Sequence, residues 1–395
     1  MIRLFDNIPD FSREALLAVL SLSLCLLYLS IKIIGRLLFS PLRHVPGPSA
    51  TKLTGATVWL STIQGRRAYK LEELHKKYGP VVRTGPNEVS ISDWRHLRTI
   101  YLNTKGMIKN PDFYKAATFV CKDNIFQMIF NIGIKLPGAI GDSYLKREYW
   151  REKSYEMVDH FLEKSADDEK YLLTPLATGV EGYLGRKLTH EELVEEAMGY
   201  MFAGSGTTSS TLAYLLYELS KPENAPIQER LRTEVLAIPH DDIVTIRNNT
   251  YINAVIKETL RAHPTIISTI PRLLTEPLTL GQYTLPSGTV IGMQNWLHHH
   301  DASVFPDPKK FVPERWLNET PEMKSALTPF SLGKRNCIGQ NLAWQELYWA
   351  VSEVMRSGLR FRVAEEMKHW EMEMEDRFNI APRGRRLMLT ASLVD

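Results

Sequence analysis

The stretch that decides the fold reads Phe330-Ser331-Leu332-Gly333-Lys334-Arg335-Asn336-Cys337-Ile338-Gly339-Gln340. Its cysteine, Cys337, stands between two glycines and directly before an apolar run with helical periodicity. We therefore expect the sulfur to lie at a helix amino terminus, where free N–H groups and the helix dipole favour a thiolate. Gly333 and Gly339 would let the backbone approach something flat and large. For a lone Cys-Ile pair, a buried structural cysteine would be the better interpretation.

The composition is that of an ordinary globular chain. Of 395 residues, 44% are apolar and 24% are charged, which excludes a collagen-like, low-complexity or mostly disordered polymer. The formal net charge of +3 gives no electrostatic case for binding nucleic acid. The three cysteines, Cys25, Cys121 and Cys337, are too few for a disulfide framework, so we expect a reducing compartment.

An apolar segment near the amino terminus predicts a membrane anchor. The run from Ala15 to Ile31, extended past Lys32, is just long enough to span a hydrocarbon core of about 30 Å. Acidic residues precede the run and no small-residue cleavage site follows it, which favours an anchor over a cleaved signal peptide. Basic residues follow the span, so the positive-inside rule places the bulk of the chain in the cytosol.

The sequence divides into an anchor, a connection and one large domain. Residues 1–40 form the predicted anchor, and residues 41–49, rich in proline, form a stiff non-helical elbow. Residues 50–395 contain no internal repeat and no Gly/Ser linker, and we interpret them as one mainly α-helical domain with small β-sheets. We expect helices at 189–220, 250–262 and 338–356, and strands within 81–92, 278–283, 289–293 and 386–393.

The full pattern around Cys337 resembles the haem-binding signature Phe-x-x-Gly-x-Arg-x-Cys-x-Gly of the cytochrome P450 superfamily. With this composition, a chance match anywhere in the chain has a probability of about two in a hundred thousand. The resemblance implies the cytochrome P450 fold, with Cys337 as the axial thiolate ligand of a haem iron. It further implies that Gly333 and Gly339 leave room for the loop, that Phe330 shields the sulfur, and that Arg335 pairs with a haem propionate.

A second motif is the Glu-x-x-Arg pair that this family carries upstream of the cysteine. Four such pairs occur where chance predicts about two, so the motif alone means little. Only Glu258/Arg261 is followed, in the family's order, by His-Pro, Pro-Arg and Phe-x-Pro-x-Arg elements before the cysteine. By resemblance, Glu258, Arg261 and Arg315 form a structural triad that locks the region around the haem loop, and Arg272 reaches a propionate.

The predicted helix 189–220 carries a third motif, Ala203-Gly204-Ser205-Gly206-Thr207-Thr208, which is similar to the oxygen-binding motif of the family. Two glycines inside a helix cost about 1 kcal/mol each relative to alanine. Close approach to a haem face, along Ala203 and Gly204, would explain them. A small-residue patch for helix packing is the alternative.

The same motif implies a proton pathway with one member replaced. The Thr207 hydroxyl can bond back into the preceding turn, and the resemblance implies that it stabilises bound dioxygen and helps to deliver protons. Gly206 stands where the family usually has an acid. Proton delivery would therefore run through water and hydroxyls such as Ser205 and Thr208.

Two further features limit the resemblance. Between about 115 and 190 the chain is far shorter than the family, with no Trp-x-x-x-Arg or His-x-x-x-Arg to hold the propionates, so we expect weaker haem retention. The run His298-His299-His300 invites a metal-site interpretation, but adjacent side chains on an irregular segment point in different directions. We expect no second metal there.

The resemblance predicts a single-pass haem-thiolate monooxygenase of the endoplasmic reticulum membrane, with its catalytic domain facing the cytosol. It would insert one oxygen atom of O2 into an apolar small molecule, with electrons from NADPH through a reductase docking near Lys334 and Arg335. The stretch 78–86 looks most like fungal members that modify secondary metabolites. A haem-thiolate isomerase or peroxide-using enzyme, which needs no relay acid, and a truncated non-catalytic remnant are the alternatives.

Overall fold

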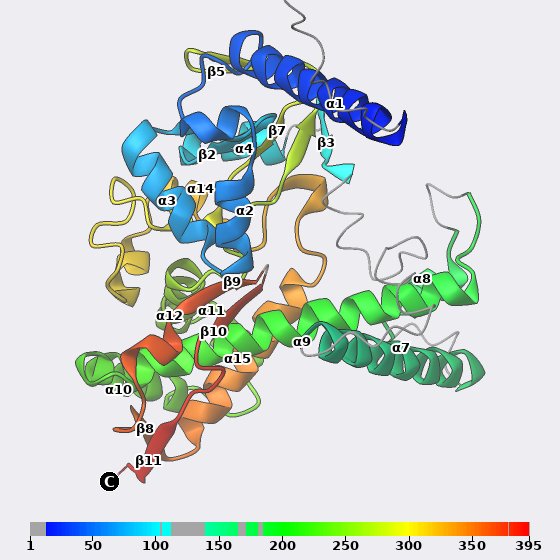
Figure 1. Ribbon diagram of the computed structural model, residues 1–395. Coiled ribbons are helices and arrows are strands. Elements are labelled where there is room, and N and C mark those ends of the chain that lie inside the picture. Colours follow the sequence, from blue (N-terminus) through cyan, green and yellow to red (C-terminus); the bar gives the residue numbers. More distant parts are fainter. Residues whose placement is uncertain are drawn as a thin grey trace, which may run out of the picture.

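The computed structural model describes residues 13–102, 105–111, 139–164, 171–180, 185–377 and 379–394. Most of the helices gather at one end of the molecule, and a five-stranded sheet lies at the other end, next to the amino-terminal helix α1 (Arg13–Leu38) (Figure 1). Helix outweighs strand, as predicted. Cys121 and the stretch 112–138 lie outside the described residues.

The longest helix of the body is α9 (His190–Ser220), which begins as the sequence predicts. Thr189 accepts from the backbone N–H of Glu192, and the Glu192 carboxylate accepts from the N–H of Thr189, which completes a capping box. Helices pack against α9 on several sides: α7 (Ala139–Lys164), α10 (Ala225–Leu236), α12 (Thr250–Ala262) and α15 (Gln340–Arg356). Buried side chains of α9, α10, α12 and α15 form the largest core cluster, which includes Leu215, Leu219, Leu231, Val255, Leu347 and Val351.

The five-stranded sheet has the order β1-β2-β7-β4-β3. The expected hairpin is formed by β1 (Val81–Gly85) and β2 (Glu88–Ile91), and β2 pairs in parallel with β7 (Val290–Gly292). The strand β4 (Arg272–Leu274) is antiparallel to both β7 and β3 (Met107–Lys109). Because β3 and β4 pair in this register, Lys109 lies directly opposite Arg272.

Three two-stranded sheets complete the β structure. They are β5 (Leu278–Leu280) with β6 (Tyr283–Leu285), β8 (Leu359–Val363) with β11 (Leu389–Leu393), and β9 (Met374–Arg377) with β10 (Asn379–Pro382). The single strand expected at 278–283 is instead the start of a hairpin, because the backbone reverses at Gly281 with φ of 57°.

Short helices connect these elements. They are α2 (Ala56–Ile63), α3 (Arg67–Tyr78), α4 (Leu97–Tyr101), α8 (Thr174–Thr178), α11 (Ile243–Asn248), α13 (Asn295–His299) and α14 (Pro321–Ala326).

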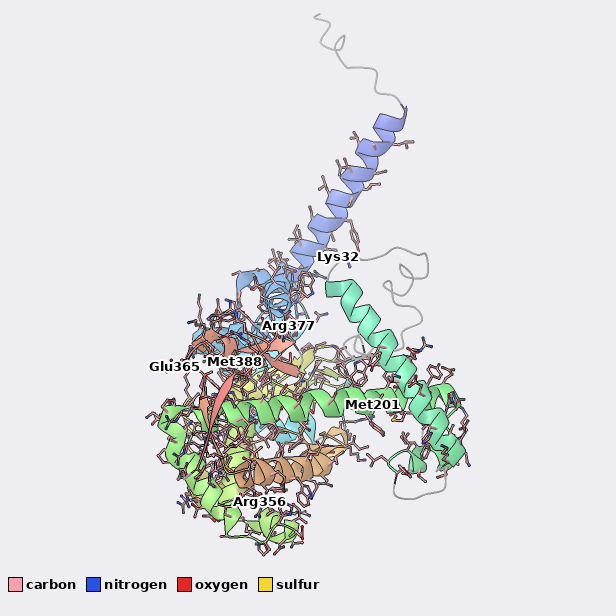
Figure 2. All side chains as sticks on the ribbon, turned by 90° about the horizontal axis from the view of Figure 1, so that it is seen from below. Lys32, Met201, Arg356, Glu365, Arg377 and Met388 are labelled. Carbon is pink, nitrogen blue, oxygen red and sulfur yellow. The ribbon has the colours of Figure 1, made fainter. Side chains whose placement is uncertain are left out.

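The amino-terminal helix α1 projects from the body (Figure 2). Its segment Leu17–Leu38, with a mean hydropathy of 2.3, is long and apolar enough to cross a membrane. The proline-rich elbow that follows is tied to β1 by Arg83, whose buried guanidinium donates to the Ser40 hydroxyl at 2.8 Å. The backbone N–H of Arg83 also donates to the carbonyl of Pro46 at 2.7 Å. The anchor helix is therefore joined to the sheet by buried hydrogen bonds.

Candidate functional site

The cysteine loop runs from α14 to the start of α15 and is closed by its own backbone. The N–H of Cys337 donates to the carbonyl of Phe330 at 2.9 Å, and the N–H of Asn336 donates to Gly333 at 3.1 Å. Gly333 has φ of 75°, and a Cβ there would lie 2.5 Å from the carbonyl oxygen of Tyr101. Both the backbone conformation and the close approach therefore require glycine.

The sulfur of Cys337 lies just ahead of α15. The thiol is free and exposed. Gly339 is the N-cap residue of α15, and a Cβ on it would lie 4.0 Å from Sγ of Cys337. The predicted place of the sulfur near a helix amino terminus therefore agrees with the structure, although the helix starts two residues later than Ile338.

Phe330, the first residue of the loop, packs against α15. It is partly buried, packs against the largest core cluster, and lies with its ring centroid 6.3 Å from that of Trp344 on α15. The loop is thus anchored at both ends to the same helix.

The middle of α9 lies close to the beginning of α15, which packs against it (Figures 1 and 2). Ala203, Gly204 and Ser205 are exposed on α9, and nothing lies within 4 Å of the position that a Cβ on Gly204 would occupy. The Thr207 hydroxyl donates to the carbonyl of Ala203 at 2.7 Å, the bond back into the preceding turn that the sequence suggested. Ser205 makes the equivalent bond to Met201, whereas Thr208 is partly buried.

Glu258 forms the centre of a buried hydrogen-bond network. Glu258 and Arg261 are fully buried, and Arg261 donates to both carboxylate oxygens of Glu258, at 2.8 and 2.9 Å. Arg315 donates to the same carboxylate at 3.2 Å. The network also includes two donors that the sequence did not suggest, the backbone N–H of Val312 at 2.8 Å and the indole N–H of Trp316 at 2.9 Å.

Arg261 extends this network toward the segment that leads to the cysteine loop. Its guanidinium donates to the carbonyls of His299, Pro308 and Lys310. Of the three Glu-x-x-Arg pairs whose side chains the structure describes, only Glu258/Arg261 forms an ion pair between its two members. The family order therefore selected the pair that is joined in space.

The histidine run supports the same segment by separate contacts. His298 and His299 belong to α13, so the expectation of an irregular segment is wrong for these two residues. Nε2 of His299 accepts from the N–H of Thr328 at 2.9 Å, and Nε2 of His298 contacts the Thr328 hydroxyl at 2.9 Å. Burial lowers the pKa of His298 to about 3. Within the described ranges, no three His, Cys, Asp or Glu side chains are grouped so that they could hold a metal ion.

Three cations gather between the sheet and the cysteine loop. Lys109 and Arg272 are opposite each other on β3 and β4, and Arg335 follows Gly333 in the loop. Partial desolvation, together with the nearby guanidinium groups of Arg335 and Arg272, lowers the pKa of Lys109. Arg272 is buried, and its guanidinium lies 4.9 Å from the ring centroid of Tyr101. Like charges placed opposite each other are destabilising unless an anion lies between them.

Sequence reasoning missed Lys109 and Tyr101. No motif marks either residue, because their positions depend on strand pairing and on the approach of the loop to α4. The hydroxyl of Tyr101 accepts from the N–H of Met293 at 2.9 Å and lies 3.1 Å from the carbonyl of Ile270. Tyr101 therefore contacts the sheet, the loop and Arg272 at once.

This set of groups fits a haem. An exposed thiol lies ahead of α15, Gly204 leaves space on α9, and neither Arg272 nor Arg335 has an acidic partner among the described residues. A thiolate ligand together with cations for two propionates is the donor set that a thiolate-ligated haem requires.

Comparisons with known proteins find relatives in one protein family. The family model described as Cytochrome P450 matches residues 143–387. The chain is 25% identical to cytochrome P450 monooxygenase orf2 of Aspergillus niger in an alignment of 489 positions, gaps included, which covers 94% of this chain and 98% of that protein. It is 26% identical to cytochrome P450 monooxygenase BOT1 of Botryotinia fuckeliana, covering 90% of this chain and 92% of the relative. These matches confirm the expected likeness to fungal members.

A solved structure shares the fold. Retinoic acid bound cyanobacterial CYP120A1 superposes with a TM-score of 0.69 at 18% identity, covering 89% of this chain and 99% of that one. This likeness confirms the predicted fold class. Because the family model matches more than half of this chain, the chain belongs to the cytochrome P450 family of haem enzymes.

Proposed function

We propose that this chain is a membrane-anchored haem-thiolate monooxygenase that hydroxylates an apolar small molecule in fungal secondary metabolism. The observation that carries the proposal is the exposed Cys337 thiol ahead of α15, in a loop closed by backbone hydrogen bonds. When bound there, a thiolate-ligated haem supplies O2 activation, with the thiolate favouring O–O cleavage. The electrons come from NADPH through a reductase that docks near Lys334 and Arg335.

Each side of the site has its own task in this proposal. Cys337 is the axial ligand, Phe330 covers the sulfur from the side of α15, and Gly333 and Gly339 leave room for the loop. Arg272 and Arg335 hold the propionates, and we add Lys109 as a third cation, which compensates in part for the lack of a Trp-x-x-x-Arg motif between about 115 and 190. Glu258, Arg261 and Arg315 hold the segment before the loop without touching the haem.

The hydroxyl groups of α9 direct protons in this proposal. The Thr207 hydroxyl donates to Ala203 within its own helix, so its oxygen lone pairs can accept a hydrogen bond from water. Ser205 has the same arrangement. In this proposal Thr207 and Thr208, one turn after Ala203 and Gly204, orient water on that face of α9, Ser205 orients water beside it, and protons reach the site through that water.

Location follows from the amino-terminal helix. Its length and hydropathy support a single span, and the basic residues after it support a cytosolic body at the endoplasmic reticulum membrane. The three parts 1–40, 41–49 and 50–395 then correspond to the anchor, the elbow and the haem domain.

Two observations favour other activities. Gly206 in place of an acid suits a peroxide-using enzyme or an isomerase, which needs no proton relay. The alignment with the A. niger relative, 489 positions for a chain of 395 residues, supports an internal shortening that we place between about 115 and 190. Such a shortening suits a remnant that holds no productive haem.

The spectrum of the reduced, CO-bound protein tests the proposal. The parent chain should show the long-wavelength Soret band of a thiolate-ligated iron, and Cys337→Ser should lose it. Cys25→Ser is the matched control, since Cys25 lies on α1 and is also a free, exposed cysteine. Absence of the band in the parent would favour the remnant, whereas turnover with a hydroperoxide and no reductase would favour the peroxide-using enzyme.

A further inference from the structure

Asn379, at the start of β10, lies directly over Gly206 of α9. Its Nδ2 atom is 2.8 Å from the position that a Cβ on Gly206 would occupy. The next residue, Ile380, is held on both sides, because its N–H donates to the carbonyl of Thr265 at 2.8 Å and its carbonyl accepts from the Ser210 hydroxyl at 3.2 Å. The backbone of β10 is therefore fixed on α9, and the Asn379 carboxamide occupies the space beside Gly206.

The carboxamide oxygen of Asn379 is buried and has no hydrogen-bond partner. A buried amide oxygen without a donor is destabilising, so the position favours a donor from outside the chain. The neighbouring hydroxyls of α9 do not supply one, because Ser205, Thr207 and Ser209 each donate to a carbonyl one turn earlier. Their oxygens are left as acceptors.

Water satisfies both kinds of group at once. It donates two hydrogen bonds, so a single molecule can donate to the oxygen of Asn379 and to a hydroxyl oxygen of α9. Thr207, the residue after Gly206 and the one that back-bonds to Ala203, is the nearest such hydroxyl in sequence.

We propose that Asn379, whose carboxamide fills the space where Gly206 carries no side chain, is a positioning residue that holds a water molecule beside Thr207. This inference rests on the proposed function. The neutral carboxamide fixes the water without itself exchanging a proton, so the position of the water is kept although the acid is absent.

The first test uses the full-length, haem-loaded protein with CO bound to the reduced iron. The infrared C–O stretch reports the polarity beside the CO, and its shift on exchange of H2O for D2O reports a nearby water. We expect both the position of the stretch and its D2O shift to change in Asn379→Leu, which has a similar size and no polar atom. Asn379→Asp, which keeps an acceptor, should retain the D2O shift.

The second test measures thermal unfolding and needs no bound CO. Gly199→Ala on the same helix should raise Tm, because nothing lies within 4 Å of the new Cβ and alanine favours the helix. Gly206→Ala should lower Tm, because its Cβ meets the carboxamide of Asn379. The loss should disappear in the Asn379→Ala background.

The outcomes separate the two proposals. One outcome is a parent protein that shows the haem-thiolate band while Asn379→Leu leaves the C–O stretch and its D2O shift unchanged. That result overturns only the role of Asn379. The same conclusion follows if the change appears only after a small molecule is added, since the partner would then be a substrate group. A parent without the haem-thiolate band overturns the proposed function itself, while the glycine comparison still decides whether the contact exists.

Discussion

The substitution Glu258→Gln tests how much the buried network contributes to stability. It keeps the shape of the side chain but removes the charge, and it replaces one acceptor oxygen by an amide donor. Arg261, fully buried, and Arg315, nearly so, then lose the carboxylate that compensates them.

The cost can be worked out from the contacts. Glu258 accepts five hydrogen bonds from four residues, and an amide can satisfy only those that reach its single oxygen. Breaking a buried ion pair by removing one partner costs about 3–5 kcal/mol. Since the whole stability of a domain is about 5–15 kcal/mol, we expect the variant to lose a large part of it.

Urea unfolding in detergent, followed by circular dichroism, gives the measurement. The matched control is Glu73→Gln, which breaks an exposed pair with Lys70 at the same spacing along a helix. That pair contributes about 0.2–0.5 kcal/mol. If Glu258→Gln and Glu73→Gln lower the free energy of unfolding equally, the network does not stabilise the fold as argued.

Three further predictions concern the haem cradle, the buried histidine and the anchor. Arg272→Gln should speed the transfer of haem to apomyoglobin about tenfold or more, because a charge-assisted hydrogen bond to the haem is lost. The Tm of the haem-free protein should not fall, because the repulsion between Arg272 and Lys109 is relieved. Slower haem transfer would contradict the role of Arg272. His298 has a pKa of about 3 in the folded chain against 6.5 when unfolded, so its contribution to stability is complete above about pH 6.5 and falls by about 1.4 kcal/mol per pH unit as acid is added. His298→Gln should flatten the decline of the urea midpoint between pH 6.5 and 5, and an unchanged slope would refute the assignment. Removal of residues 1–38 should release the protein from sedimented membranes, and a truncated chain that still sediments would require a second membrane contact.

Local signals predicted the elements that carry the site. The capping box at Thr189 predicted the start of α9, and Pro264 predicted the end of α12, since each signal depends on a few neighbouring residues. The cysteine loop was equally predictable, because its motif is local and because Gly333 is required by its positive φ and by the close approach of the Tyr101 carbonyl.

Contacts between distant segments were not predictable in this way. Lys109 meets Arg272 only because β3 pairs with β4 in one particular register, and a shift by one residue would turn the lysine to the other face. Asn379 meets Gly206 because β10 is fixed on α9 by hydrogen bonds that no short motif encodes.

Tyr101 has a consequence for how this site can change. Its carbonyl oxygen contacts Gly333, its ring packs against the guanidinium of Arg272, and its hydroxyl accepts a hydrogen bond from the N–H of Met293 next to the sheet. The thiol loop and the cation cluster therefore share one fixed point, so neither can shift alone. An insertion or deletion elsewhere in the chain that leaves this tyrosine in place preserves the spacing between sulfur and cations, whereas a change at α4 would disturb both together.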